Sequence, residues 1–447
     1  MLYQLFVTTQ DPVRFWSAMG LIAIGAALLS AHVRWVRPYF RRFYWVIDYP
    51  ELVRRTLRLN GHKGESMVQR HPKVVFRFWR ARLYRSAYRI GIAALVAPLF
   101  WGMYQLYGSS FLWFLGLYVV TGLGITIGFH RNGAHISFKA PDWLRAILFS
   151  AGVWAIQGLP KEWMKKHAGP HHTFADSSLD VHSPLVLGQQ KSETRLGVAY
   201  EHTMAFAHSF VIWAFRAKSL SRPKGMSIEE WIQTNKKEVP DLATFHYREC
   251  DAPYWQGFNL QGKQILTPQQ KLEKTWIGMW DTIERIERDK VVSFISQPFV
   301  YSVLVFLSFF LPWYIGGVTL GEACARVVFT SWVTFGVNSV CHLWGEKPFN
   351  TPDHSQNNAF IEVLALGEGG HANHHYRASW AEHGIFPWQL DVSAEVIKAL
   401  GLVGIIDKKS IKLPRKREVI LAAAYMERGY RAKRMERKLR RLATASA

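Results

Sequence analysis

The strongest chemical signal in the sequence is a set of histidines grouped in short stretches. In the stretch 367–375, Gly-Glu-Gly-Gly-His-Ala-Asn-His-His, three histidines are spaced three and four residues apart, which on a helix would place them on one face. The stretches 129–135, 167–172 and 338–342 carry the others. The nine grouped histidines are His130, His135, His167, His171, His172, His342, His371, His374 and His375. One ion holds about four to six ligands, so nine imidazoles indicate two metal ions.

Neutral imidazole suits several transition metals, so these residues alone leave iron, zinc and copper open. A lone histidine, by contrast, is more often an ordinary packed or solvated residue than a metal ligand. We therefore interpret most of the remaining histidines as structural: His32, His62, His71, His202, His208, His246, His354 and His383.

Long apolar runs must position the histidines. The runs cover 15–36, about 90–107, 111–129, 291–318 and 323–344. Each approaches or exceeds the roughly 20 residues that a helix needs to cross a bilayer, and Arg326 is a rare charge within them. Very short links join the second run to the third and the fourth to the fifth. The pattern predicts an all-α integral membrane protein with two transmembrane helical hairpins, hence four spans, and with 15–36 as a candidate fifth span.

The charge distribution predicts which side of the membrane the histidines occupy. After each hairpin the chain returns to the side it left, so 34–89, 130–290 and 345–447 share one compartment. Most of the formal net charge of +22 lies in these segments, which by the positive-inside rule indicates the cytoplasm. We therefore expect a multi-pass membrane protein whose histidines form a cytoplasmic helical cap over the spans.

The basic residues flank apolar spans, and no nucleic-acid-binding motif accompanies them, so we expect no nucleic acid partner. Membrane lipids with anionic headgroups and an acidic soluble protein are the expected counterparts.

The predicted organisation has three parts. Residues 1–85 form an N-terminal extension, 86–412 the membrane domain and 413–447 a basic helical tail, which lies either on the membrane surface or in solvent. Within the domain, 143–159 is too short and too broken to span, so it lies in the interface or re-enters the membrane. Residues 216–290 are read as a polar insertion.

Cysteine contributes little to the predicted chemistry. Cys250, Cys324 and Cys341 are too few for a disulfide framework. Cys341 adjoins His342, but adjacent residues on a helix diverge by about 100°, so we interpret it as a small core residue and not as a ligand.

The order of the histidine stretches resembles that of the membrane fatty-acid desaturases. His-x4-His follows a hairpin, a second histidine-rich box follows some thirty residues later, and Asn338-Ser-Val-Cys-His-Leu-Trp-Gly345 precedes the Gly-Glu-Gly box. Together with His383-Gly-Ile-Phe-Pro-Trp-Gln-Leu-Asp391, these stretches are most similar to the acyl-CoA delta-9 (stearoyl-CoA) branch. The resemblance covers roughly 86–412, without most of 216–285.

The resemblance implies a site and a reaction. The nine histidines would bind two non-haem irons, and Asn338, one helical turn before His342, would hold a water on one of them. The implied reaction is O2-dependent insertion of a cis double bond, at delta-9, into a saturated acyl chain carried on CoA, a carrier protein or a lipid. His182 matches a recurrent family position that is not a ligand. No dinucleotide or haem-attachment motif is present in the sequence, so electrons would come from a separate carrier, a ferredoxin or a cytochrome b5-like protein with its reductase.

The second box departs from the family pattern. Where that branch usually has His-x-x-His-His, this chain has His-Ala-Gly-Pro-His-His, one residue longer. Because proline disrupts a helix interior, we predict that one helix ends at His167 and another begins with Pro170. Ala168 also replaces an arginine that is common in acyl-CoA desaturases.

Carboxylates near the boxes could orient the imidazoles through hydrogen bonds. The candidates by proximity in sequence are Glu162, Asp176, Asp180, Asp353 and Glu368.

Three other functions could use a histidine-rich metal site in a membrane protein. A membrane di-iron hydroxylase or oxygenase acting on lipid or alkyl chains would share the histidines and is the main alternative. A metal transporter would carry more ionisable residues within its spans than this chain does. A zinc hydrolase would need neither O2 nor a reductant.

Overall fold

The computed structural model describes only part of the chain. The described residues are 101, 104, 108–176, 180–187, 194–213, 226–227, 230, 268–349, 351, 353–386, 388–415, 418–419 and 422. They form helices, with one isolated bridge between Glu346 and Asn357 and no β-strand among them. The helical fold class is thus confirmed for these residues. The predicted span at 15–36, most of that at 90–107 and most of the basic tail lie outside them.

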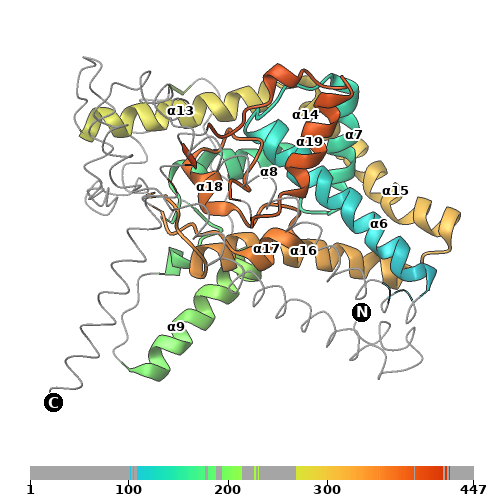
Figure 1. The fold of residues 1–447 in the computed structure, drawn as a ribbon, viewed down its shortest axis with the longest axis horizontal. Coiled ribbons are helices and arrows are strands. Elements are labelled where there is room, and N and C mark those ends of the chain that lie inside the picture. Colours follow the sequence, from blue (N-terminus) through green and yellow to red (C-terminus); the bar gives the residue numbers. More distant parts are fainter. Residues whose placement is uncertain are drawn as a thin grey trace, which may run out of the picture.

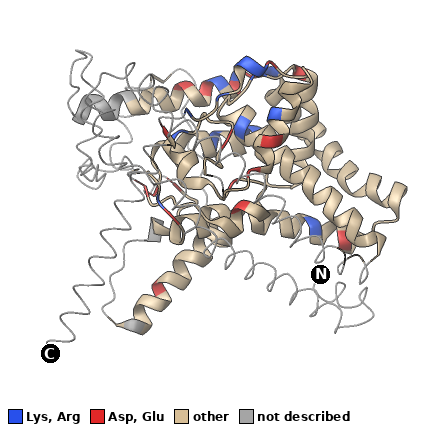
Figure 2. Cartoon of the chain, viewed as in Figure 1, with Lys and Arg blue, Asp and Glu red and all other residues tan. Residues whose placement is uncertain are grey.

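Two described helices are long and apolar enough to cross a membrane, Ser109–Ala134 and Pro298–Gly316. The first is α6 (Ser109–Leu123) continued by the π-helical η1 (Gly124–Ala134), and the second is α15 (Pro298–Gly316). Neither α6 nor α15 contains a charged residue, as Figure 2 shows. The longer α16 (Leu320–Leu343) contains Glu322, Arg326 and many polar residues, which lower its mean hydropathy. The layout of four spans therefore stays a prediction.

The apolar run 291–318 is divided, where the sequence suggested one span. Asp289 caps α14 (Lys290–Ile295), and α15 starts anew with Pro298 in its first turn. Proline lacks an N–H and keeps the preceding residue, Gln297, extended, so the helix must restart there. The expected short turn to α16 is present, because Gly317 adopts the left-handed conformation and a capping box at Thr319 begins α16.

Helices α7 (Asp142–Val153) and α8 (Pro160–Lys166) pack against η1 beside α6 and α14 (Figure 1). Gly124 of η1 lies against the backbone of Gly152 in α7, so neither position has room for a side chain. Phe129, Phe149 and Met164 fill the core between these elements. The segment 143–159 thus forms a short packed helix and a loop, in agreement with its being too short to span.

Helix α13 (Pro268–Arg288) lies within the predicted polar insertion at 216–290, most of which is outside the described residues. Its side chains Trp276, Met279, Ile283 and Ile286 are buried, and it packs on the second histidine box. Arg285 donates hydrogen bonds to the carbonyls of Gly133 and Ala134 at the end of η1. The helix is amphipathic, with charged residues on one face and an apolar stripe on the other, so its polar sequence does not by itself reveal the buried face.

The remaining described elements complete the fold. They are η2 (His167–His171), η3 (Pro184–Leu187), α9 (Arg195–Ala207), η4 (His208–Ile212), α17 (Ala359–Leu364), α18 (His371–Tyr376), α19 (Val392–Leu402) and η6 (Lys408–Ser410). In Figure 1, α18 lies centrally between α8 and α16, while α9 projects away from the other helices. The chain after η6 joins two distant segments, because the Lys412 N–H donates to the carbonyl of Ser137 and the Lys412 carbonyl accepts from the N–H of Ala381.

Candidate metal centre

The first histidine pair is positioned by a π-helical turn. In an α-helix, residues five apart point about 140° away from each other, so His130 and His135 would diverge. Residues 124–134 are π-helical instead, and the His135 N–H donates to the His130 carbonyl, five residues back, at 3.1 Å. The wider turn brings the two rings together, with their centroids 5.0 Å apart.

The second box also contains a π-helical turn, and the predicted break at Pro170 is wrong. Residues His167–His171 form η2, which continues α8 with Pro170 inside it. A π-helical turn holds one residue more than an α-helical turn, and Pro170 is tolerated there because the backbone ladder is already shifted. The longer spacing of this box is therefore absorbed without ending the helix.

The other four histidines come from α16 and α18. His342 lies in the last turn of α16, and His371, His374 and His375 lie on α18. The helix predicted for this stretch is confirmed, but its three imidazoles do not all point to the same group of histidines. His371 and His375, one turn apart, point to one group of histidines, whereas His374 points to another.

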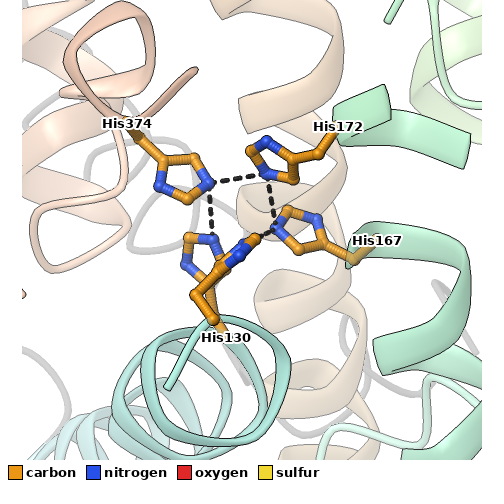
Figure 3. Close-up of side chains that lie close together, drawn as sticks. His130, His167, His172 and His374 are labelled. Carbon is orange, nitrogen blue, oxygen red and sulfur yellow. Dashed lines mark hydrogen bonds between the residues drawn. The ribbon is translucent and has the colours of Figure 1, made fainter. Parts of the chain in front are cut away.

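We call the first group cluster A. Its members are His130, His135, His167, His172 and His374, whose ligand nitrogens all lie within 4.8 Å of one another. Figure 3 shows imidazoles from η1, the second box and α18 pointing toward one another. The Nε2 atom of His374 lies 2.8 Å from those of both His130 and His172, and that of His167 lies 3.1 Å from that of His172 and 3.0 Å from that of His135.

We call the second group cluster B. Its members are His171, His342, His371 and His375. The Nε2 atoms of His342 and His371 are 3.0 Å apart, and those of His171 and His375 are 3.2 Å apart. The clusters are adjacent because His171 and His172, like His374 and His375, are neighbours in the chain that belong to different clusters.

Four of the five candidate carboxylates contact these imidazoles through Nδ1. His130 is 2.7 Å from Glu368, His171 is 3.1 Å from Asp180, His342 is 2.9 Å from Asp176 and His375 is 3.0 Å from Asp353. The fifth candidate, Glu162, pairs with Lys165 instead. An ionised carboxylate can only accept, so each contacted imidazole donates from Nδ1 and presents a bare Nε2 lone pair.

The electrostatics favour ionised carboxylates and neutral imidazoles at the positions without a carboxylate contact. Burial opposes ionisation, but the adjacent imidazoles and hydrogen bonds hold the pKa of Asp176, Asp180 and Asp353 below the usual range. Burial first, and then the neighbouring imidazoles, lower the pKa of several ring nitrogens well below the usual histidine value: those of His135, His167, His172, His371 and His374. Neutral imidazole is the form that binds metal.

This arrangement fits metal ions. His171 and His375 both donate from Nδ1 to carboxylates, yet their bare Nε2 atoms face each other at 3.2 Å. Two lone pairs this close repel unless a cation lies between or beside them. An ion with metal–nitrogen bonds of about 2.1 Å separates neighbouring ligands at right angles by about 3.0 Å. The observed nitrogen separations in both clusters lie close to that value.

A buried ion-pair network supports cluster A and was missed by the sequence reasoning. Arg131 donates to Glu368 at 3.1 and 3.2 Å and to Asp391 at 2.9 Å. His383, interpreted from sequence as a lone structural residue, has its Nδ1 atom 3.4 Å from Glu368, and its ring centroid is 4.5 Å from that of His374. The stretch His383–Asp391, noted in the sequence for its resemblance, was the available signal for this network.

Two other noted residues lie beside cluster B. Asn338 is in α16, one turn before His342. The Nδ1 atom of His182 lies 3.6 Å from Asp180, the carboxylate that also holds His171. Cys341 lies in an apolar core cluster with Tyr118 and Val337, as expected of a core residue.

Comparison with known proteins gives relatives of one kind, although no family model matches the chain. The palmitoyl-monogalactosyldiacylglycerol delta-7 desaturase of Arabidopsis thaliana is 29% identical over 357 residues, 78% of this chain and 75% of that protein. The delta-9 acyl-lipid desaturase 2 of the same plant is 27% identical over 378 residues, 81% and 95% of the two chains. The icosanoyl-CoA 5-desaturase of Limnanthes douglasii is 27% identical over 344 residues, 75% of each chain. The comparisons agree with the order of the histidine boxes, and this chain is similar over 75–81% of its length to proteins named as fatty-acyl desaturases, which are oxidoreductases.

Proposed function

We propose that this chain is a membrane-bound, non-haem di-iron desaturase that uses O2 to insert a cis double bond into a saturated acyl chain. The observation that carries the proposal is the convergence of nine histidines into two adjacent clusters with ligand-like nitrogen separations. Relatives named for desaturation of acyl-lipids and of acyl-CoA support the substrate class. Within that class we propose an acyl-CoA-like substrate and the delta-9 position.

The proposed ligands are the five histidines of cluster A for one iron and the four of cluster B for the other. Asn338 would hold a water on the iron of cluster B, because it lies on the same face of α16 as His342. When bound, the two irons would supply, with O2, an oxidant strong enough to remove hydrogen from an unactivated methylene.

The protein's own part is to orient the ligands and keep water away. Each carboxylate contact fixes the Nδ1 proton of an imidazole and directs its Nε2 inward. Trp163 stacks on His167, with ring centroids 5.1 Å apart, and donates to Gln157. His171, His342 and His371 are almost completely buried, so bulk solvent does not reach them.

We further propose the four-span layout, with the clusters on the cytoplasmic face and the membrane domain over 86–412. The two apolar helices support membrane association. Electrons would come from a separate protein, a ferredoxin or a cytochrome b5-like carrier with its reductase, because no cofactor-binding motif for internal supply occurs in the sequence.

The test is product analysis. The chain is expressed in a host that lacks its own desaturase, with His374→Ala as the control, and total fatty acids are analysed by gas chromatography and mass spectrometry. We expect new monounsaturated chains only with the intact protein, and the spectra give the double-bond position. His374 projects into cluster A, so its loss should abolish activity while the protein still inserts in the membrane.

Hydroxylated chains would instead establish the hydroxylase alternative. An active His374→Ala protein with its full iron content would refute the ligand assignment. If no product forms, the iron content of the purified protein decides whether the centre exists.

A further inference from the structure

The two clusters differ in the groups that surround them. In cluster B, three of the four imidazoles contact a carboxylate through Nδ1: His171 on Asp180, His342 on Asp176 and His375 on Asp353. In cluster A, the described contact of this kind is that of Glu368 with His130.

The carboxylate of cluster A is also shared. Arg131 donates to Glu368 Oε1 from two nitrogens, and this guanidinium is completely buried. A buried arginine neutralises much of the negative charge that Glu368 could pass to His130. The carboxylates of cluster B accept mainly from uncharged groups: Asp353 accepts from Thr351 and Ser355, and Asp180 from backbone N–H groups. Lys347 contacts the backbone carbonyl of Asp353 and not its carboxylate.

A carboxylate on Nδ1–H raises the basicity of the imidazole and fixes Nε2 as the donor atom, and losing such a contact typically lowers metal affinity about 10- to 100-fold. Cluster A has one more imidazole, but it has fewer ligands that are held in the metal-binding tautomer by an anion. Two additional carboxylate contacts, at about 10-fold each, favour cluster B by about 100-fold.

We propose that the two clusters are unequal metal sites, with cluster B binding the first ion tightly and cluster A binding the second more weakly. This inference rests on the proposed two-ion centre. It assigns Asp176, Asp180 and Asp353 as positioning residues that establish the order of filling.

The first test uses the full chain, purified metal-free in detergent and titrated with 57Fe(II) without oxygen. Mössbauer spectra and calorimetry follow the titration. We expect one quadrupole doublet up to one equivalent and a second doublet only beyond it, with dissociation constants about 100-fold apart. Two doublets that grow in constant proportion from the first addition would overturn the inference. Saturation below two equivalents would instead overturn the two-ion centre itself.

The second test replaces Asp353 by Asn. Oδ1 of Asp353 accepts from Thr351 and Ser355, which an amide oxygen can still do, and Oδ2 alone faces His375. The amide NH2 placed there would make His375 Nδ1 an acceptor, so the proton would move to Nε2 and block metal binding. We expect the first binding step to weaken about 10- to 100-fold, with the second step unchanged.

The matched control is Asp142→Asn, since the Asp142 side chain is 78% exposed and pairs with Arg145, which is not a member of either cluster. It should leave both binding steps unchanged. If Asp353→Asn weakened only the second step, the assignment of the tight site to cluster B would be wrong. The order of filling in the unmodified protein remains a test even if the Asn variant folds poorly.

Discussion

Arg131 offers the sharpest test of the physical reasoning, because its side chain is completely buried and compensates two buried carboxylates. We predict that Arg131→Met, which keeps an unbranched side chain and removes its donors, destabilises the folded protein. Breaking a buried ion pair costs about 3–5 kcal/mol, since the remaining charge stays desolvated.

The remaining contacts place the cost at the lower end of that range. After the substitution, Asp391 still accepts from the N–H groups of His383, Gly384 and Ala394, and Glu368 still accepts from His130. We therefore expect a loss of about 3 kcal/mol, or roughly a 150-fold larger unfolded fraction. At about 1–2 °C per kcal/mol for a chain of this length, this corresponds to a Tm lower by about 3–6 °C.

The assay is thermal unfolding of the metal-free protein in detergent, so that metal binding does not add to the stability. The control is Arg288→Met, because the Arg288 side chain is 81% exposed in its pair with Glu284 and should leave Tm unchanged. Equal unfolding temperatures for Arg131→Met and the unmodified protein would show that the guanidinium does not compensate the two carboxylates.

Three further substitutions test the packing of the helices and the ligand set. Gly124→Ala should lower the free energy of unfolding by about 1–3 kcal/mol, because its Cβ would collide with the backbone of Gly152. Gly116→Ala, with open space around the new Cβ, should raise it by about 0.5–1 kcal/mol. Thermal unfolding measures both, and equal effects would contradict the close approach of the helices at Gly124. Cys341→Ala should keep two equivalents of iron, since Cys341 packs in an apolar cluster; loss of one equivalent on elemental analysis would make the thiol a ligand.

The sequence was informative about which histidines gather, but not about how they divide between cluster A and cluster B. Spacing could place His371, His374 and His375 on one short helix, yet a spacing of three residues leaves about 60° between side chains and a spacing of four about 40°. The orientation of α18 then decides which cluster each imidazole joins. That orientation depends on contacts with distant segments, such as the hydrogen bonds of Asn373 to Asn357 and His383.

Contacts in the folded chain also explain other features that the sequence did not reveal. Pro170 has a strong local preference for a helix start, but the π-helical turn of η2 accommodates it. The sequence of α13 is polar on average, although its buried face, with Trp276 and Ile286, packs on the second box. Among the carboxylates close in sequence to the boxes, proximity alone does not show that Asp353 contacts His375 whereas Glu162 pairs with Lys165.

The π-helical turns also bear on how histidine boxes can change in length during evolution. A π-helical turn arises from an α-helix by insertion of one residue, and the helix keeps its course on both sides. In η2 the additional residue lies between His167 and His171, so loss of a single codon there would give the shorter box while leaving α8 in register. Box length and metal geometry are therefore separable traits, and two desaturases whose alignment requires a gap at this box can still present the same imidazoles to the same ions.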